Sequence, residues 1–179
     1  MADDVTGSVR FELPEGSVRV RGEPVVVLPA QALETLLHAS PAASRVDMGR
    51  DVGYVMGRMI AARLGGSDEV RSAPIEKVVT ELATEVAMLG LGLVHFERWG
   101  RALVVGISGG PLAKQTEMLA GLLGGAISSA TGAHAAAISL PEGRYFVSNQ
   151  RACDRMRSLL AGGMAWGDAL AHLQQGGAS

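Results

Sequence analysis

Three glycines recur at intervals of four residues in this 179-residue chain, at Gly49, Gly53 and Gly57, and Ala61 follows at the next interval. In an α-helix, residues four apart lie on one face, so these positions form a single stripe of small residues. Each glycine inside a helix costs about 1 kcal/mol relative to alanine. Three on one face therefore indicate that a second helix or a ligand approaches the backbone closely, and the helix contact is the slightly favoured interpretation.

The composition fits one compact domain with an aliphatic core. Hydrophobic residues make up 47% and charged residues 19%, whereas aromatic residues make up only 4%. A chain of this length and balance buries a sizeable core and is not globally disordered. The net charge of -2 and the pI near 6.1 show no basic excess. We therefore expect no nucleic-acid partner, because nucleic-acid-binding domains usually carry such an excess.

The single cysteine, Cys153, excludes an intramolecular disulfide and a cysteine metal cluster. The first residues lack the basic-then-apolar layout of a signal peptide. The uncharged segment from Met118 to Ile138 is rich in Gly, Ala, Ser and Thr, which suits a membrane span poorly. We interpret it as a buried helix followed by a strand, and we expect a cytoplasmic protein without a membrane span.

Hydrophobic periodicity predicts an N-terminal strand arm over residues 1–21, a single domain over residues 22–175 and a frayed tail at 176–179. The order of elements after the arm is helices, hairpin, helix, hairpin, helices. This order favours the α+β form of an α/β fold, in which helices pack on an antiparallel sheet of hairpins. The expected helices cover residues 29–38, 41–64, 74–89, about 112–131, 151–160 and 166–173; the expected hairpins cover 93–107, with a turn at 98–101, and 135–148; a loop is expected at 65–68.

The segment 106–110 matches the G-x-S-x-G pattern and lies between an expected strand and an expected helix. In α/β-hydrolases this turn exposes a nucleophilic serine, here Ser108, which a later Asp and His must activate. Asp154 or Asp168 with His172 would be the candidates. The preceding strand belongs to a hairpin and the chain is short for that fold, so an esterase is a remote alternative. A glycine-rich turn is the simpler interpretation.

No metal or cofactor is expected from the remaining polar residues. The four histidines fall in different elements, and none has a second His, Cys or carboxylate at a recognised ligand spacing. They are His38, His95, His134 and His172. No phosphate-binding glycine motif with its lysine is present in the sequence.

The order of several short motifs resembles the 4-vinyl reductase (hydrocarbon-binding) domain family, which shares its fold with the small subunits of the TRAPP tethering complex. The similarity spans about residues 22 to 173, and its weight lies in the order and spacing of the motifs. The matching segments are Val25–Pro29, Gly49–Gly53, Gly90–Gly92, Ala120–Gly125, Gly143–Val147, Leu160–Gly163 and Asp168–Leu170.

The resemblance implies helices packed on an antiparallel sheet, frequent homodimers and an apolar cavity for small hydrophobic or aromatic molecules. Some members carry a cysteine-based metal site near the last hairpin. The corresponding residues 135–146 contain no cysteine, so no metal is carried over to this chain.

These observations predict a non-catalytic binding protein that holds a small hydrophobic molecule or acts as a protein scaffold. We expect it to form a homodimer through its helical face. The alternative is an adaptor or regulator without a ligand, for example a roadblock-like partner of a small GTPase. Polar anchors are expected at Arg50 and Tyr54. The expected apolar lining comes from the second helix and the glycine-rich helix: Met56, Met59, Ile60, Leu119, Leu122 and Leu123.

Overall fold

The computed structural model describes residues 9–20, 22–99 and 102–175, and within them the chain forms two antiparallel sheets and seven α-helices. The strands are β1 (Val9–Glu12), β2 (Ser17–Val20), β3 (Glu23–Val25), β4 (Leu93–Trp99), β5 (Ala102–Ser108), β6 (Ala136–Leu140) and β7 (Arg144–Ser148). The α-helices are α1 (Ala30–Ala39), α2 (Ala42–Leu64), α3 (Ser67–Ser72), α4 (Ile75–Met88), α5 (Thr116–Thr131), α6 (Gln150–Ala161) and α7 (Trp166–Gln175). Two short 3-10 turns, η2 (Leu13–Glu15) and η3 (Pro141–Gly143), precede β2 and β7.

The main sheet has the strand order β4-β5-β7-β6, with every neighbouring pair antiparallel. Successive residues of a strand point to opposite faces of a sheet. Accordingly, Val105 and Tyr145 join one hydrophobic core, whereas Val104 and Phe146 join a second core on the other face. Both faces of the sheet are therefore covered.

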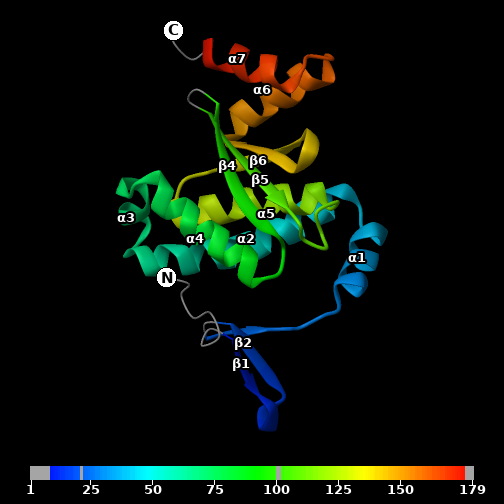
Figure 1. Ribbon diagram of the computed structural model, residues 1–179, viewed down its shortest axis with the longest axis vertical. Helices are drawn as coiled ribbons and strands as arrows, with labels where there is room; N and C mark the ends of the chain where they lie inside the picture. Colours follow the sequence, from blue (N-terminus) through cyan, green and yellow to red (C-terminus); the bar gives the residue numbers. More distant parts are fainter. Residues whose placement is uncertain (1–8, 21, 100–101, 176–179) are drawn as a thin grey trace.

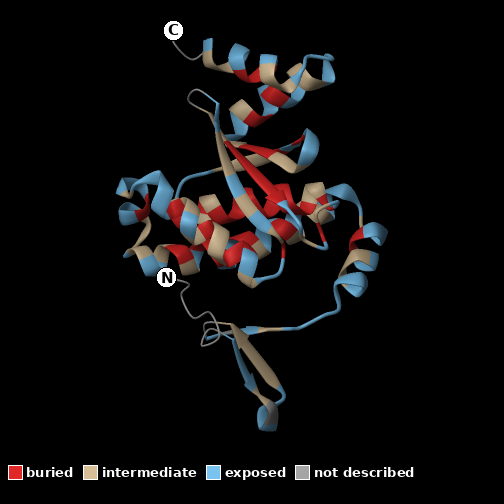
Figure 2. Ribbon diagram, in the orientation of Figure 1, coloured by how far each residue is buried: buried red, intermediate tan, exposed pale blue. Residues whose placement is uncertain are grey.

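The two faces are covered by different helices. The larger core contains buried side chains from α1 to α5, and the smaller one contains side chains from α6 and α7. In Figure 1 the pair α6–α7 lies at one end of the molecule, while α2, α4 and α5 form its middle. Figure 2 shows that α5 is buried along much of its length.

Glycines terminate α2 and α4 where the chain must reverse. Gly65 and Gly90 have φ angles of 101° and 68°, in the left-handed region that side chains with a Cβ rarely adopt. The next amide nitrogens reach back five residues: Gly66 N donates to the Ala61 carbonyl at 2.8 Å, and Leu91 N donates to the Val86 carbonyl at 3.0 Å. These bonds satisfy carbonyl groups that the helix ends leave unpaired.

The strands β1, β2 and β3 form a separate small sheet, the N-terminal sheet, which projects from the body and is joined to α1 by residues 26–29 (Figure 1). The linker is exposed, with Val26 at 83%. The strand β3 follows the expected boundary at residue 21, so that boundary runs through this sheet. Residues 1–8 and 21 of the expected arm, and the expected tail at 176–179, lie outside the described residues.

The structure confirms the expected α+β fold with its antiparallel sheet and hairpins. It also confirms that the uncharged segment forms a buried helix, α5, followed by the strand β6. Two details differ from expectation. Residues 67–72 form the helix α3 instead of a simple loop, and β4 continues to Trp99, into the expected turn. None of the helices in the described ranges is long and apolar enough to cross a membrane.

Candidate functional site

The glycine stripe of α2 packs directly against α5, and we call this contact the glycine seam. A Cβ atom at Gly49, Gly53 or Gly57 would overlap the main-chain carbonyl oxygen of Met118, Leu122 or Ala126 respectively. The partner moves forward along α5 as the glycine moves forward along α2, so the two helices run parallel.

Glycines of α5 contribute to the same seam from the opposite side. A Cβ atom at Gly121 would overlap the carbonyl oxygen of Val46, and one at Gly125 would overlap that of Arg50. The Ser129 hydroxyl also donates to the Tyr54 carbonyl oxygen at 2.9 Å. The stripe therefore serves a tight helix contact, and it leaves no room for a ligand between the two backbones.

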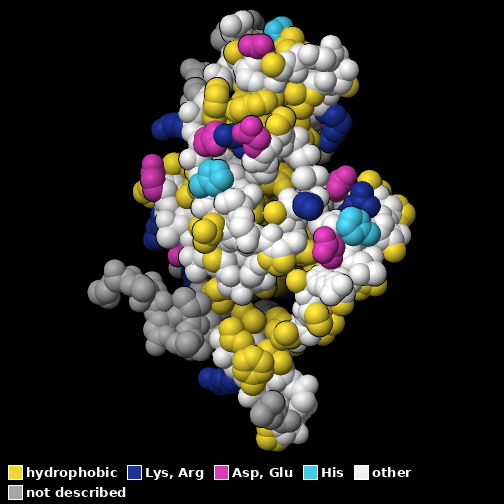
Figure 3. Space-filling view, turned by 45° about the vertical axis from the view of Figure 1, so that its right-hand side comes forward, with side chains coloured by type: hydrophobic (Ala, Val, Ile, Leu, Met, Phe, Trp, Pro, Cys, Tyr) yellow, Lys and Arg dark blue, Asp and Glu magenta, His cyan; other side chains and the backbone are white. Residues whose placement is uncertain are grey.

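A cavity of about 390 Å³ lies on another side of α2, and we call it the arm cavity. It lies between the N-terminal sheet with its linker and the helices of the body. Figure 3 shows hydrophobic side chains gathered where this sheet meets the body. From α2 come Val52, Val55, Met56 and Met59; from the N-terminal sheet and linker come Val20, Pro24, Val25 and Val26; the remaining wall is Leu33, Glu85, Leu89, Leu91 and Met118.

A buried ion pair stands at the wall of the arm cavity. Glu85 of α4 is only 2% exposed and lines the cavity. Its Oε1 atom lies 2.7 Å from Nη2 of Arg63 on α2, and Nε of the same guanidinium lies 2.6 Å from Oε2 of Glu81. One arginine thus bridges two carboxylates that are one helical turn apart on α4.

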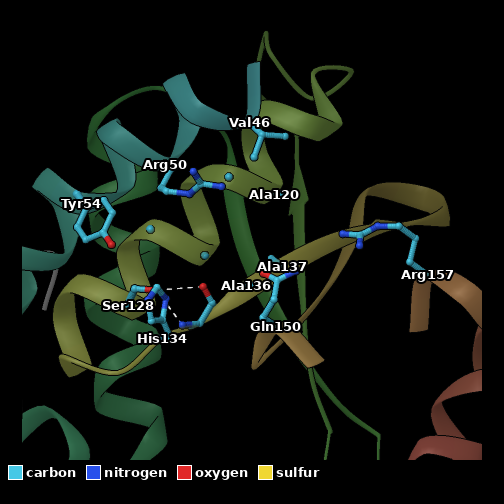
Figure 4. A pocket seen from close by; sticks show the side chains of 14 residues that line it. Val46, Arg50, Tyr54, Ala120, Ser128, His134, Ala136, Ala137, Gln150 and Arg157 are labelled. Carbon is cyan, nitrogen blue, oxygen red and sulfur yellow. Dashed lines mark hydrogen bonds between the residues drawn. The ribbon is translucent and has the colours of Figure 1, made fainter. Parts of the chain in front are cut away.

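A second depression of about 450 Å³, which we call the glycine cleft, lies beside the glycine seam (Figure 4). It is lined by small residues of α5, by His134 and by the three alanines at positions 135–137. Arg50 and Arg157 enter it from opposite sides, but each is paired with a neighbouring aspartate, Asp47 and Asp154, at 2.7 Å. The two arginines are therefore already neutralised by partners on their own helices.

The expected site residues separate into three groups. Arg50 and Tyr54 line the glycine cleft, whereas Met56 and Met59 line the arm cavity. The other expected lining residues belong to the main core, and the structure places none of them on either cavity: Ile60, Leu119, Leu122 and Leu123, each at most 1% exposed.

Sequence reasoning missed the contribution of Glu85 to the arm cavity. The spacing of Ile75, Val78, Leu82 and the apolar residues that follow them predicts the helix over residues 74–89. Glu85 adjoins that apolar stripe and lies four residues before Leu89, at the spacing of one helix face. An acidic residue beside a buried face was the available signal. Its orientation toward a cavity depends on the fold.

Ser108 lies exposed at the end of β5, where the strand register pairs it with Leu93. The opposite end of β5 lies near α7, because the side-chain amide of Gln174 donates to the carbonyl oxygen of Trp99. His172 is on α7 as well. The structure therefore does not bring together the serine and the histidine that an esterase would need.

Cys153 is fully buried in the smaller core, and its Sγ lies 3.4 Å from the Ala136 carbonyl oxygen. Burial raises the pKa of this thiol to about 11, so it stays protonated and is a poor nucleophile or metal ligand at neutral pH. Among the described residues, no group of three or more His, Cys, Asp or Glu side chains is placed to hold a metal ion.

The hydroxyl of Tyr145 is buried in the larger core without a hydrogen-bond partner among the described residues. Burial, and after it the negative charge of Glu117, raises the pKa of Tyr145 to about 12. This hydroxyl belongs to the packing between the sheet and the helices, and it lines neither the arm cavity nor the glycine cleft.

No protein-family model matches the sequence, and no curated protein matches it either. Among solved structures, the chain is similar to the phenol-responsive sensory domain of the transcription activator PoxR, in a crystal structure with phenol. The TM-score is 0.59 at 14% sequence identity, and the match covers 95% of this chain and 93% of that chain. At this identity, the likeness shows a shared fold.

Proposed function

We propose that this protein is a non-catalytic binding protein that holds a small hydrophobic molecule in the arm cavity. The observation that carries the proposal is the cavity itself, about 390 Å³ in volume and walled almost entirely by aliphatic and methionine side chains. Ligand sites in proteins commonly have volumes of about 300–1,000 Å³ and predominantly apolar walls. Methionines such as Met56 and Met59 adapt their shape to irregular ligands.

Two further observations support a binding role. One solved structure with a similar fold is a sensory domain in a crystal structure with phenol. The sequence motifs resemble the 4-vinyl reductase, or hydrocarbon-binding, domain family. The separation of Ser108 from His172 favours binding over ester hydrolysis. We include membership of that family in the proposal.

The proposal is tested with a neutral hydrophobic fluorophore, N-phenyl-1-naphthylamine, whose emission rises when it leaves water. We expect saturable binding to the parent protein. The substitution Val52→Phe fills the cavity from α2 and should weaken binding at least about tenfold, which corresponds to about 1.4 kcal/mol. The matched control is Val79→Phe, which adds the same ring in a separate surface groove between α4 and β4–β5.

Equal loss of binding in both variants, or no saturable binding by the parent, would contradict the proposal. Native mass spectrometry of the purified chain is a second test, because a co-purifying apolar compound would appear as a discrete added mass. A clean apo mass together with absent fluorophore binding would favour the ligand-free adaptor.

The expected homodimer belongs to the same proposal. Large apolar side chains are exposed on the linker and on α1, including Val27 at 67% and Leu36 at 54%. Exposed apolar groups of this kind gather at protein–protein contacts. Gel filtration with light scattering should give about twice the mass of 18.5 kDa, and a species at the monomer mass would contradict the dimer.

A further inference from the structure

The lining of the glycine cleft contains basic side chains and no carboxylate. Among the described residues that line it, the basic ones are Arg50 of α2, His134 and Arg157 of α6. The chain as a whole has a net charge of -2, so this lining departs from the overall charge balance. A hollow lined by charge of one sign attracts ligands of the opposite sign. The cleft is therefore suited to an anion.

The two arginines converge on the cleft from elements that are far apart in the sequence. Figure 4 shows Arg50 and Arg157 on opposite sides, with small residues between them. A guanidinium group is a planar fork that can bind two oxygens of one carboxylate or phosphate at once. The volume of about 450 Å³ lies within the range of about 300–1,000 Å³ that is usual for small-molecule sites.

The aspartates that pair with these arginines lie outside the lining of the cleft. Each accepts a hydrogen bond through Oδ1 from the Nη1 atom of its arginine at 2.7 Å, Asp47 from Arg50 and Asp154 from Arg157. All four side chains are at least half exposed, and ion pairs of this kind contribute little free energy. Because a guanidinium group has five N–H donors, an oxyanion can bind beside the aspartate or replace it.

The surface between the arginines suits the apolar body of a ligand. It consists of glycines and alanines, whose side chains do not extend beyond Cβ. The Ser128 hydroxyl fixes this surface, since it donates to the Ala135 carbonyl oxygen at 3.0 Å and accepts from the Ala135 nitrogen at 2.9 Å. Tyr54, which is 41% exposed, adds an aromatic ring to the same lining.

We propose that the glycine cleft binds a small organic anion, a carboxylate or a phosphate monoester. Arg50 and Arg157 hold the charged group, and the body of the molecule lies against the small residues. This site is separate from the arm cavity, so the inference does not depend on the proposed function. Arg50 and Tyr54, expected from the sequence as polar anchors of a hydrophobic cavity, bind a different ligand from the one in the arm cavity.

The probe is 1-naphthyl phosphate, and its binding to the full chain is measured by isothermal titration calorimetry at low ionic strength. We expect saturable binding that weakens as salt is added, because dissolved ions screen exposed charges. 1-Naphthoate carries a carboxylate on the same ring system. Its affinity relative to that of 1-naphthyl phosphate decides which of the two oxyanions the cleft prefers.

Three substitutions assign the binding to the arginines. Arg50→Gln and Arg157→Gln should each weaken binding of 1-naphthyl phosphate about tenfold, because each removes charged hydrogen-bond donors. The matched control is Arg155→Gln, since Arg155 is exposed on the same helix as Arg157 and does not line the cleft. This control should bind normally. Circular dichroism verifies that each variant is folded.

Asp154→Asn gives a readout in the opposite direction. It removes the carboxylate that competes for Arg157, so the affinity for 1-naphthyl phosphate should rise several-fold. A merely structural role of this ion pair would not produce a gain in affinity. An unchanged or weaker affinity in a folded Asp154→Asn variant would contradict the proposal.

The remaining outcomes separate this site from the arm cavity. Absence of saturable binding by the parent, or equal loss in Arg157→Gln and Arg155→Gln, would overturn the anion site. Val52→Phe fills the arm cavity and should leave binding of 1-naphthyl phosphate unchanged; a loss there would assign the anion to the arm cavity and overturn the proposal. Failure of the parent to bind N-phenyl-1-naphthylamine would instead refute the proposed function and leave this inference standing.

Discussion

Helix α2 packs against two neighbours in opposite ways. Toward α5 it presents glycines, and the two backbones approach so closely that a single added Cβ would overlap a carbonyl oxygen. Toward the N-terminal sheet it presents Val52, Met56 and Met59, and a cavity of about 390 Å³ remains. The same helix therefore makes a closed contact with α5 and an open contact with the N-terminal sheet. Glycines produce the closed contact, and larger side chains line the open one.

The difference shows how rigidity and adaptability are divided in this fold. Small residues allow close packing with few alternative arrangements, since there is no side chain to change its rotamer. Methionine has several rotatable bonds and tolerates irregular surroundings. The seam thus fixes α2 in the body, while the methionine side is free to accommodate a ligand. The following four experiments test that division, from the largest expected effect to the smallest.

The glycine seam should tolerate no added atoms. We expect Gly53→Ala to lower the free energy of unfolding by about 3 kcal/mol, because the new Cβ would overlap the Leu122 carbonyl and force the helices apart. Urea unfolding measures the change. Gly167→Ala in α7 is the control, since a Cβ there meets nothing within 4 Å; it should cause no loss. Equal effects at both glycines would show that the seam is not closed.

The closely packed core between the main sheet and the helices should lose stability at alkaline pH, because it buries Tyr145. Its pKa is raised to about 12 in the folded protein, whereas an unfolded tyrosine ionises near pH 10. Between these values the unfolded state binds fewer protons than the folded state, so stability falls as pH rises. We expect a loss of about 2 kcal/mol from pH 10 to 12.

Tyr145→Phe should remove that part of the alkaline loss, and at neutral pH it should cost little, because the hydroxyl has no partner among the described residues. Urea unfolding at a series of pH values compares the two slopes. Parallel slopes for the parent and the variant would contradict the assignment.

The open side should respond weakly to truncation. We expect Met59→Ala to lower stability by only about 1 kcal/mol, below the 2–5 kcal/mol typical of a fully buried methionine, because this side chain is only partly buried beside an existing cavity. Binding of N-phenyl-1-naphthylamine should weaken as wall contacts are lost. Met59→Leu conserves volume and should bind nearly normally. A stability loss near that of a core residue would mean that the cavity is tightly packed.

The smallest effect on stability is expected at Glu81, which forms a partly exposed ion pair with Arg63. Arg63 and Glu81 are each about one quarter exposed, at 26% and 25%, so solvent screens their attraction. Glu81→Gln should therefore reduce stability by about 0.5 kcal/mol. Unfolding in low and high salt measures it, and the difference between parent and variant should shrink as salt rises. A loss of several kcal/mol in the free energy of unfolding would contradict this prediction of a weak, solvent-screened pair.

Most of the fold could be predicted from local signals. Pro29, Pro41 and Pro74 precede α1, α2 and α4, and alternating apolar residues mark both hairpins of the main sheet. The helix α3 was not foreseen because its six residues, Ser67–Ser72, are too few for a hydrophobic period to appear. Short helices of this kind are stabilised by tertiary contacts, here through the buried Val70.

The candidate site was predictable only in part. The glycine spacing indicated a close approach, which the glycine seam shows. Met56 and Met59 line the arm cavity, and their role in holding a ligand stays a prediction. The sequence does not reveal that the cavity faces the N-terminal sheet, because this depends on where a separate segment folds back against α2. For the same reason Leu119 and Leu122 were expected at a cavity and lie in the core.

The parallel direction of α2 and α5 has a consequence for how the chain folds. Adjacent parallel helices cannot be joined by a short turn, and Gly53 meets Leu122 about 70 residues further along the sequence. Closing a loop of that length costs about 4 kcal/mol of chain entropy before the contact offers any stabilisation. We therefore expect the pairing of α2 and α5 to be a late, non-local step of folding, and refolding to be slower than in helical bundles with sequential neighbours.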